Sequence, residues 1–254
     1  MNDGKASPAK MPPPYLSRLR VNPDGVDDWS VFPGNLPWLR ELAMEITSGV
    51  TFFVGENGTG KSTLIEALAE KARFPHKGGS RNEWVGSEEE RSELGRAIFT
   101  DWKARPMDGF FLRAEHAAHF ADRLAERGEW AFERYGGKDL HAQSHGEAFL
   151  AILQNRLDEN GLWILDEPEA ALSPQRQLAL LVHMTQMVNT GAAQFVIATH
   201  SPILMTFPGA QIVNFDEPIC LPDIALEDTP HYQITRGILE NPGQYWRHLQ
   251  PPAE

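Results

Sequence analysis

The chain of 254 residues lacks features that mark several common protein classes. It contains one cysteine, Cys220, so an internal disulfide is excluded and a reducing compartment is the simplest interpretation. No stretch approaches the roughly 20 consecutive apolar residues of a membrane span. Residues 1–14 are polar and proline-rich, which predicts a disordered tail rather than a signal peptide. We therefore expect a cytoplasmic protein without an integral membrane segment.

Further absences bound the architecture and the partners. No internal repeat is present, so the chain is not a solenoid. A formal net charge of −12 disfavours diffuse binding to nucleic acid, although a local basic patch or an assembled dimer stays compatible with it. The length fits one α/β domain over residues 15–254. Within this domain we expect a helical subdomain over about residues 74–158.

One motif of nine residues dominates what is present. Residues 55–63 satisfy G-x-x-x-x-G-K-[ST], in which the glycines let backbone amides curl around a triphosphate. Lys61 brings a positive charge to the β and γ phosphates, and the Ser62 hydroxyl suits Mg²⁺. A β-rich stretch, 50–54, precedes the motif and an amphipathic helix, 62–72, follows it, as the function requires. The expected nucleotide-binding residues are Gly55, Glu56, Asn57, Gly58, Thr59, Gly60, Lys61, Ser62 and Thr63.

A second motif is an apolar strand, 161–165, that ends in Asp166 and Glu167. Asp166 can hold Mg²⁺ through its water shell, and Glu167 can accept a proton from the water that attacks the γ-phosphate. Taken alone, such a run often marks only a strand entering a polar loop. Coupled to the phosphate-binding motif, it predicts nucleotide hydrolysis.

The following segment predicts a β-α-β crossover. Ser173 and Pro174 are typical of a helix start, and Gly191 of a helix end. His200 follows the next strand, 194–199, at the sheet edge where α/β folds place ligands, so we expect it to contact the γ-phosphate. The face that we expect this helix to bury contains Leu178, Leu181, Val182 and Val188.

Residues 144–147, Ser-His-Gly-Glu, have two compatible interpretations. Ser144 and Glu147 can form a capping box, which is locally sufficient and has no further function. A serine beside Gly146 at a helix N-terminus also makes an anion site.

The order of these elements resembles that of the ATP-binding-cassette ATPases. Their Walker A, signature, Walker B, D-loop and switch histidine are matched by residues 55–63, 144–147, 162–167, 171–173 and His200. The resemblance covers most of the chain. It implies an α/β P-loop NTPase fold of ABC type, with a mostly parallel sheet core, an N-terminal antiparallel strand region and a helical subdomain.

The resemblance also implies ligands and a partner. ATP and Mg²⁺ are the implied cofactors, and an ATP-dependent homodimer is the implied assembly. In such a dimer the signature residues Ser144, Gly146 and Glu147 of one subunit close over the ATP that is held by the other.

The chain departs from the usual pattern at three places. Gln143 precedes the signature serine, Ser173 replaces the D-loop aspartate, and Glu115 stands where a Q-loop glutamine is expected. With Asp-Glu-Pro-Glu at 166–169, these features are similar to the non-transporter branch. That branch includes overcoming-lysogenization nucleases, DNA-repair ATPases and small stand-alone predicted ATPases.

The expected function is ATP binding and Mg²⁺-dependent hydrolysis that drives a dimer cycle in DNA maintenance or phage defence. A nucleic acid or an effector protein is the expected partner. The catalytic residues would be Glu167, His200 and Lys61, and the metal ligands Ser62 and Asp166. Two alternatives stay open: an ATP-binding subunit of a membrane transporter, and a slowly hydrolysing, nucleotide-gated binding module. Aromatic residues that are candidates for stacking on the base are Trp29, Phe32 and Trp38.

Overall fold

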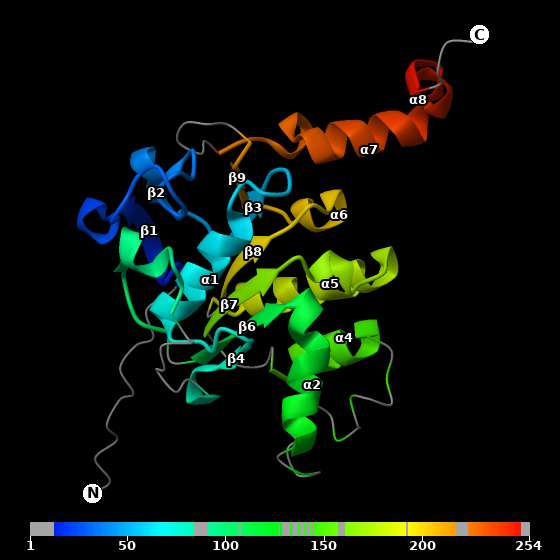
Figure 1. The fold of residues 1–254 in the computed structure, drawn as a ribbon. Coiled ribbons are helices and arrows are strands. Elements are labelled where there is room, and N and C mark those ends of the chain that lie inside the picture. Colours follow the sequence, from blue (N-terminus) through cyan, green and yellow to red (C-terminus); the bar gives the residue numbers. More distant parts are fainter. Residues whose placement is uncertain are drawn as a thin grey trace, which may run out of the picture.

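The computed structural model describes residues 13–83, 91–106, 108–126, 145–156, 161–191, 193–216 and 223–249, with five single residues between 128 and 143. The described strands form a six-stranded sheet of order β4-β6-β7-β8-β3-β9 and a three-stranded sheet of order β2-β1-β5 (Figure 1). The larger sheet is parallel except for β4, and the smaller is antiparallel. The strands are β1 Leu16–Val21, β2 Ala43–Glu45, β3 Val50–Val54, β4 Gly79–Ser80, β5 Ile98–Trp102, β6 Asp108–Arg113, β7 Gly161–Asp166, β8 Ala193–Ala198 and β9 Gln211–Asn214.

Helices cover both faces of the larger sheet (Figure 1). Phe52 and Phe53 of β3 point to opposite faces, as successive residues of a strand must, and each joins a separate core. Phe53 packs with α1 and the small sheet, whereas Phe52 packs with α2, α4 and α5. The helices are α1 Lys61–Ala72, α2 Ala117–Glu126, α4 His145–Arg156, α5 Pro174–Asn189, α6 Pro202–Met205, α7 Pro230–Glu240 and α8 Pro242–Leu249. None of those described is long and apolar enough to cross a membrane.

The expected fold class is confirmed: an α/β fold with a mostly parallel sheet, N-terminal antiparallel strands and helices. Strands β3, β7 and β8 are buried along their whole length, which explains why their sequences are almost continuously apolar. The predicted crossover is β7-α5-β8, whose strands pair in parallel. Its helix starts after Ser173, whose Oγ accepts a hydrogen bond from the Arg176 amide at 3.4 Å.

Of the four residues expected on the buried face of α5, Leu181 and Val188 are partly buried against the core, whereas the other two are not. Leu178 and Val182 are 56% and 55% exposed. Gln177 lies on the buried face because its amide donates to the Leu172 carbonyl and its Oε1 accepts from the Ser201 hydroxyl. These partners offset the cost of burying a polar side chain, which a pattern of apolar residues does not anticipate. The residues that α5 buries are Gln177, Leu180, Met184 and Met187.

Residues 74–158 contain more than helices. Strands β4 and β6 belong to the six-stranded sheet and β5 pairs with β1, so in the described part only α2 and α4 form a helical unit. The charged residues 84–90 lie outside the described residues. Of the expected tail, residues 1–12 also lie outside them, while Pro14 is buried. The division of the chain into a tail, a core and a helical subdomain stays a prediction.

Parallel pairing brings the ends of distant strands together. The carboxyl ends of β3, β6, β7, β8 and β9 lie at one edge of the larger sheet. Ligands of open α/β sheets bind outside this edge. The phosphate loop, the Asp166–Glu167 pair and His200 therefore meet there.

Candidate functional site

The loop between β3 and α1 has the conformation that glycine allows. Gly58 and Gly60 have φ angles of 84° and 91°, in the left-handed region. A Cβ atom on Gly60 would lie 2.8 Å from Leu36 Cδ2, so this position needs glycine for space as well as for conformation. Helix α1 begins directly after it, at Lys61, and its first amides lack partners within the helix. The loop thus faces the positive end of a helix dipole, which favours an anion.

Lys61 is folded back onto this loop. Its side chain is buried, and Nζ donates to the carbonyl oxygens of Gly55 and Glu56 at 2.6 and 2.7 Å. Burial lowers the pKa of Lys61, while the carboxylates of Glu167 and Asp216 oppose this shift. Phosphate oxygens would offer the same ammonium stronger, charged acceptors than these carbonyls.

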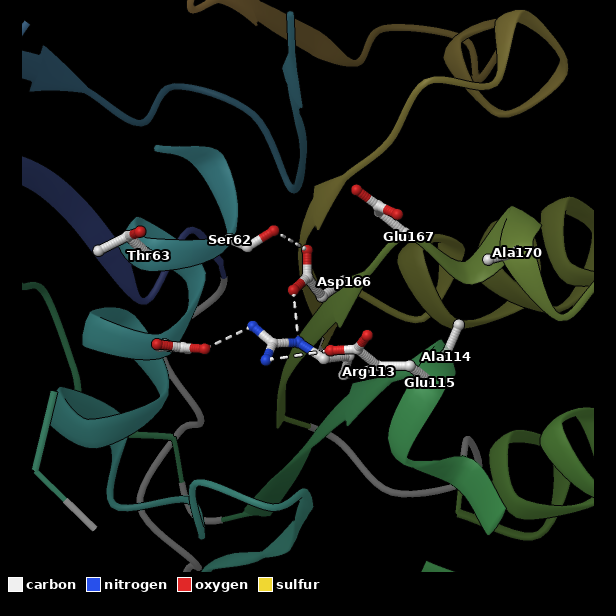
Figure 2. A pocket seen from close by; sticks show the side chains of 9 residues that line it. Ser62, Thr63, Arg113, Ala114, Glu115, Asp166, Glu167 and Ala170 are labelled. Carbon is white, nitrogen blue, oxygen red and sulfur yellow. Dashed lines mark hydrogen bonds and ion pairs between the residues drawn. The ribbon is translucent and has the colours of Figure 1, made fainter. Parts of the chain in front are cut away.

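Ser62 and Asp166, the two residues expected to bind the metal, are in direct contact. Ser62 Oγ donates to Asp166 Oδ1 at 3.1 Å, and Arg113 Nε donates to Asp166 Oδ2 at 2.8 Å (Figure 2). The Asp166 side chain is only 2% exposed. Burial raises the pKa of this carboxyl, whereas Arg113 and Ser62 act in the opposite direction.

Arg113 is a site residue that the sequence reasoning missed. It ends β6 and lies directly opposite Asp166 in the pairing with β7. Its guanidinium also contacts Glu66 of α1 at 2.6 Å and Glu115 at 3.4 Å. The available signal was a charged residue at the end of the apolar run 110–112, the same pattern that singled out Asp166.

Glu167 stands at a sharp change of backbone direction. Its φ and ψ of 48° and 52° are left-handed, which is uncommon for a residue with a side chain and is found preferentially at functional sites. Its amide donates to the Ala198 carbonyl at 2.9 Å, which ties the end of β7 to the end of β8. The carboxylate is 41% exposed and lies 3.5 Å from His200 Nε2.

His200 is held from two sides. Its amide donates to Glu169 Oε1, and its ring Nδ1 lies 2.9 Å from Nε2 of His231, the second residue of α7. Burial, Lys61 and His231 all lower the pKa of His200. Glu169 and His231 were not predicted as site residues. His231 lies 31 residues after His200 in the chain, and no local motif connects the two.

Two adjoining pockets share Ser62, Thr63 and Glu167. One measures about 330 Å³ and the other about 470 Å³, within the size range of small-molecule sites. The first is also lined by Glu66, Arg113, Ala114, Glu115, Asp166 and Ala170 (Figure 2). The second is also lined by Phe32, Asn35, Leu36, Pro37, Asn57, Gly58, Gly60 and Lys61.

The three aromatic candidates for base stacking differ in access. Trp38 is fully buried, donates through Nε1 to the Thr59 carbonyl at 2.7 Å and supports the phosphate loop instead. The Arg40 guanidinium lies over the Trp29 ring, 4.4 Å from the ring centroid. Phe32 is 48% exposed and lines the second pocket, so it alone of the three has a free face on the site.

The described residues of the predicted signature, Gly146 and Glu147, are separate from these pockets within one chain. Ser144 lies outside the described residues. Gly146 is buried, and a Cβ added there would lie 2.6 Å from the Ala171 carbonyl oxygen. Glu147 Oε1 lies 3.1 Å from Arg176 Nη2. Neither Gly146 nor Glu147 is among the described residues that line the two pockets.

A family model described as "AAA domain, putative AbiEii toxin, Type IV TA system" matches residues 79–206, about half of the chain. The chain belongs to this family. A second model, described as "AAA domain", matches residues 35–69, which include the whole phosphate loop, 55–63. No curated protein matches the chain.

Several solved structures are similar to this AAA domain. An SMC head domain from Thermotoga maritima is 15% identical, with a TM-score of 0.46 over 83% of this chain and 99% of that chain. CbiO1 from Clostridium perfringens, part of the ABC transporter complex cbiONQ, is 20% identical, with a TM-score of 0.42 over 82% and 90%. A putative metal-chelate type ABC transporter in an inward-facing conformation is 14% identical, with a TM-score of 0.45 over 74% and 76%.

AAA domains are nucleotide-binding ATPase domains that use ATP with Mg²⁺, and the donor atoms of this AAA domain suit that ion. Ser62 Oγ and Asp166 Oδ1 are hard oxygen donors placed side by side. No group of three or more His, Cys, Asp or Glu side chains in the described part could hold a metal ion. The two oxygen donors of Ser62 and Asp166 fit Mg²⁺, which keeps several waters and takes its remaining ligands from phosphate.

Proposed function

We propose that this AAA domain hydrolyses ATP with Mg²⁺, between two copies of itself. The observation that carries the proposal is the contact of Ser62 Oγ with Asp166 Oδ1, at 3.1 Å, beside the buried ammonium of Lys61. It joins the phosphate loop to the carboxylate of a different strand. Phosphoryl transfer depends on such positioning of charge rather than on covalent chemistry by the protein.

The residues divide the work as follows. The loop amides and Lys61 hold the phosphates, while Ser62 and Asp166 would hold Mg²⁺, which neutralises negative charge on the phosphates when bound. Glu167 accepts the proton of the attacking water, for which its exposed carboxylate is suited. His200 donates from Nε2 to the γ-phosphate. Glu115, which lines the first pocket, would orient water or the metal's water shell.

The dimer completes the site. Glu167 lines both pockets and is 41% exposed, which leaves an open side of the site, and the start of α4 packs against Ala171 and Arg176 instead of closing over it. We assign Ser144, Gly146 and Glu147 of a second copy to that open side. ATP would then join the two copies, and hydrolysis would release them.

The biological setting that we favour is phage defence, with DNA maintenance as the related possibility. The description of the family, which names a putative toxin, supports this setting. The partner would be an effector protein or a nucleic acid. The alternative is an ATP-binding subunit of a membrane transporter. Purification from the native host distinguishes them, because only a transporter subunit would bring down an integral membrane protein.

The direct experiment measures phosphate release and molecular mass on the purified chain. We expect turnover with ATP and Mg²⁺ that stops with a chelator, and a monomer that doubles in mass with ATP under non-hydrolysing conditions. Lys61→Ala is the control, because removal of the ammonium should abolish both effects. A wild-type chain that neither binds nor hydrolyses ATP would contradict the proposal.

A further inference from the structure

The pair of His200 and His231 lies at the junction between the site and the C-terminal helices. His231 is the second residue of α7, which leads away from the body of the molecule toward α8 (Figure 1). Nδ1 of His200 and Nε2 of His231 are 2.9 Å apart, and the two ring centroids are 4.9 Å apart. A contact this short between two imidazole nitrogens contains one proton, which belongs to one ring or the other.

The start of α7 holds His231 firmly. Thr229 is fully buried and caps the helix: its Oγ1 accepts from the Tyr232 amide at 3.3 Å and donates to the Leu226 carbonyl at 2.7 Å. His231 follows Pro230 in the first turn. The ring is therefore positioned by the local backbone and not by its contact with His200 alone.

The surroundings decide which ring donates. His231 Nδ1 is buried and has no hydrogen-bond partner among the described residues. If His200 donated to His231, a neutral His231 would carry its proton on this buried Nδ1, where it would have no acceptor. If His231 donates, Nδ1 carries only a lone pair, which costs less than a buried donor without a partner.

The other end of the pair leads to the same assignment. His200 Nε2 is also buried without a hydrogen-bond partner among the described residues, but it lies 3.5 Å from Glu167 Oε1, so a proton on Nε2 faces a carboxylate whereas a lone pair there would face negative charge. A His200 that accepts through Nδ1 carries its proton on Nε2. This proton is the one that His200 needs if it is to donate to a phosphate oxygen.

We propose that His231 is a positioning residue: by donating from Nε2 to Nδ1 of His200, it holds His200 in the tautomer whose Nε2–H points into the site. This inference rests on the proposed ATPase function for its consequence, but the tautomer itself does not depend on it. The role resembles that of any group whose hydrogen bond to one imidazole nitrogen determines the state of the other. No sequence motif places a histidine of α7 in the site.

The first measurement is imidazole nitrogen NMR of the uniformly ¹⁵N-labelled full chain at pH 8, with the His200 signals assigned by their loss in His200→Gln. We expect one His200 tautomer, Nε2–H, in the wild type and in His231→Gln, whose side-chain amide can still donate. We expect a mixture of tautomers in His231→Ala. A wild-type His200 protonated on Nδ1, or an unchanged His200 in His231→Ala, overturns the proposal.

The second measurement is steady-state ATP turnover. His231→Ala should lower kcat by about 10- to 100-fold, as when an outer partner of a functional imidazole is lost, with KM for ATP within about twofold of wild type. His231→Gln should recover most of kcat, and adding His231→Ala to His200→Gln should cause no further loss. A further loss in that background would mean that His231 acts elsewhere, which overturns the proposal.

Two controls separate the possible failures. His183→Ala removes an α5 histidine that contacts Gln154 at 2.9 Å, and it should leave both kcat and the His200 signals unchanged. A wild-type chain without ATP turnover would contradict the proposed function, whereas the NMR spectra would still decide the role of His231.

Discussion

Arg113 and Asp166 form a buried ion pair across neighbouring strands, with Nε of one donating to Oδ2 of the other at 2.8 Å. Their side chains are 11% and 2% exposed. Asp166 also accepts a hydrogen bond from the Ser62 hydroxyl. The carboxylate that we propose as a metal ligand is thus already paired with a fixed cation, Arg113. Arg113 thus makes it possible to bury a charged Asp166 beside the phosphate loop.

Arg113→Gln should therefore lower the free energy of unfolding by about 3–5 kcal/mol, because it leaves the carboxylate of Asp166 buried without an opposite charge. Urea denaturation measures the change. Arg20→Gln is a matched control, since the Arg20–Asp101 pair is 42% and 41% exposed and its loss should change the free energy of unfolding far less.

A second variant tests the cause of that loss. Adding Asp166→Asn to Arg113→Gln removes the uncompensated charge and should restore more than half of the lost stability. If the double variant is as unstable as Arg113→Gln, burial of an unpaired carboxylate is not the reason.

Glu167→Gln should retain ATP binding and lose turnover by about 10²- to 10⁴-fold, because it keeps size and hydrogen bonding but removes the base. Since the side chain is 41% exposed, stability should hardly change. Trapped ATP should accumulate dimers in light scattering. A variant that stays monomeric with ATP and hydrolyses it at the wild-type rate would refute both the base and the dimer.

Ser144→Ala distinguishes a helix cap from a ligand supplied to a second copy. A cap would contribute about 0.5–2 kcal/mol to stability and leave turnover per folded molecule unchanged. A ligand for the partner's ATP would leave ATP binding intact but abolish dimerisation and hydrolysis. Mixing inactive Ser144→Ala with inactive Lys61→Ala should then restore activity, because the heterodimer contains one intact composite site. No recovery in subunits shown to have mixed would argue against a shared site.

Stability should depend on pH through His200. Burial, Lys61 and His231 lower its pKa below the ordinary 6.5, so its contribution to stability is present above that pH and is lost as the pH falls toward the folded-state pKa. The free energy of unfolding of the wild type should consequently fall more steeply between pH 7 and about 5 than that of His200→Gln. Identical slopes for wild type and His200→Gln would show that this histidine is not held neutral by the fold.

Gly60→Ala and Gly58→Ala test the shape of the phosphate loop as a pair. Both residues are left-handed, and an alanine at either should cost about 1–2 kcal/mol. At Gly58 an added Cβ meets nothing within 4 Å, whereas at Gly60 it lies 2.8 Å from Leu36 Cδ2 and 3.2 Å from Trp38 Cζ2. Gly60→Ala should thus cost about 1–3 kcal/mol more in chemical denaturation. Equal losses of stability in the two variants would mean that the Leu36 side chain moves aside at no cost.

The elements that sequence reasoning predicted well are those with a local signal. The strand 50–54, the phosphate loop and the helix after it follow from β-branched and aromatic residues, spaced glycines and apolar periodicity, and the structure has them as β3, the loop and α1. Ser173 as the cap of α5 was predicted for the same reason, since a cap depends on its own and adjacent residues. The parallel sheet followed from apolar strands separated by a helix.

The errors and omissions involve contacts between residues distant in the chain. Gln177 was not expected on the buried face of α5, because its partner there is Ser201, which lies 24 residues later. Trp38 was a candidate for base stacking, but the fold encloses it behind the phosphate loop. A pattern of residue types contains no information about which partner a polar or aromatic side chain will meet.

By itself, then, the sequence determined the chemistry at the ends of individual strands: amides and Lys61 after β3, carboxylates after β7 and an imidazole after β8. Only the tertiary structure decided what lies against those groups. Arg113 reaches Asp166 because β6 pairs with β7, and His231 reaches His200 because α7 begins beside β8's end. A motif is formed by residues that are close in the sequence, so the sequence shows it. Arg113 and His231 are brought to the site by the order of the strands and by the path of the chain after β9.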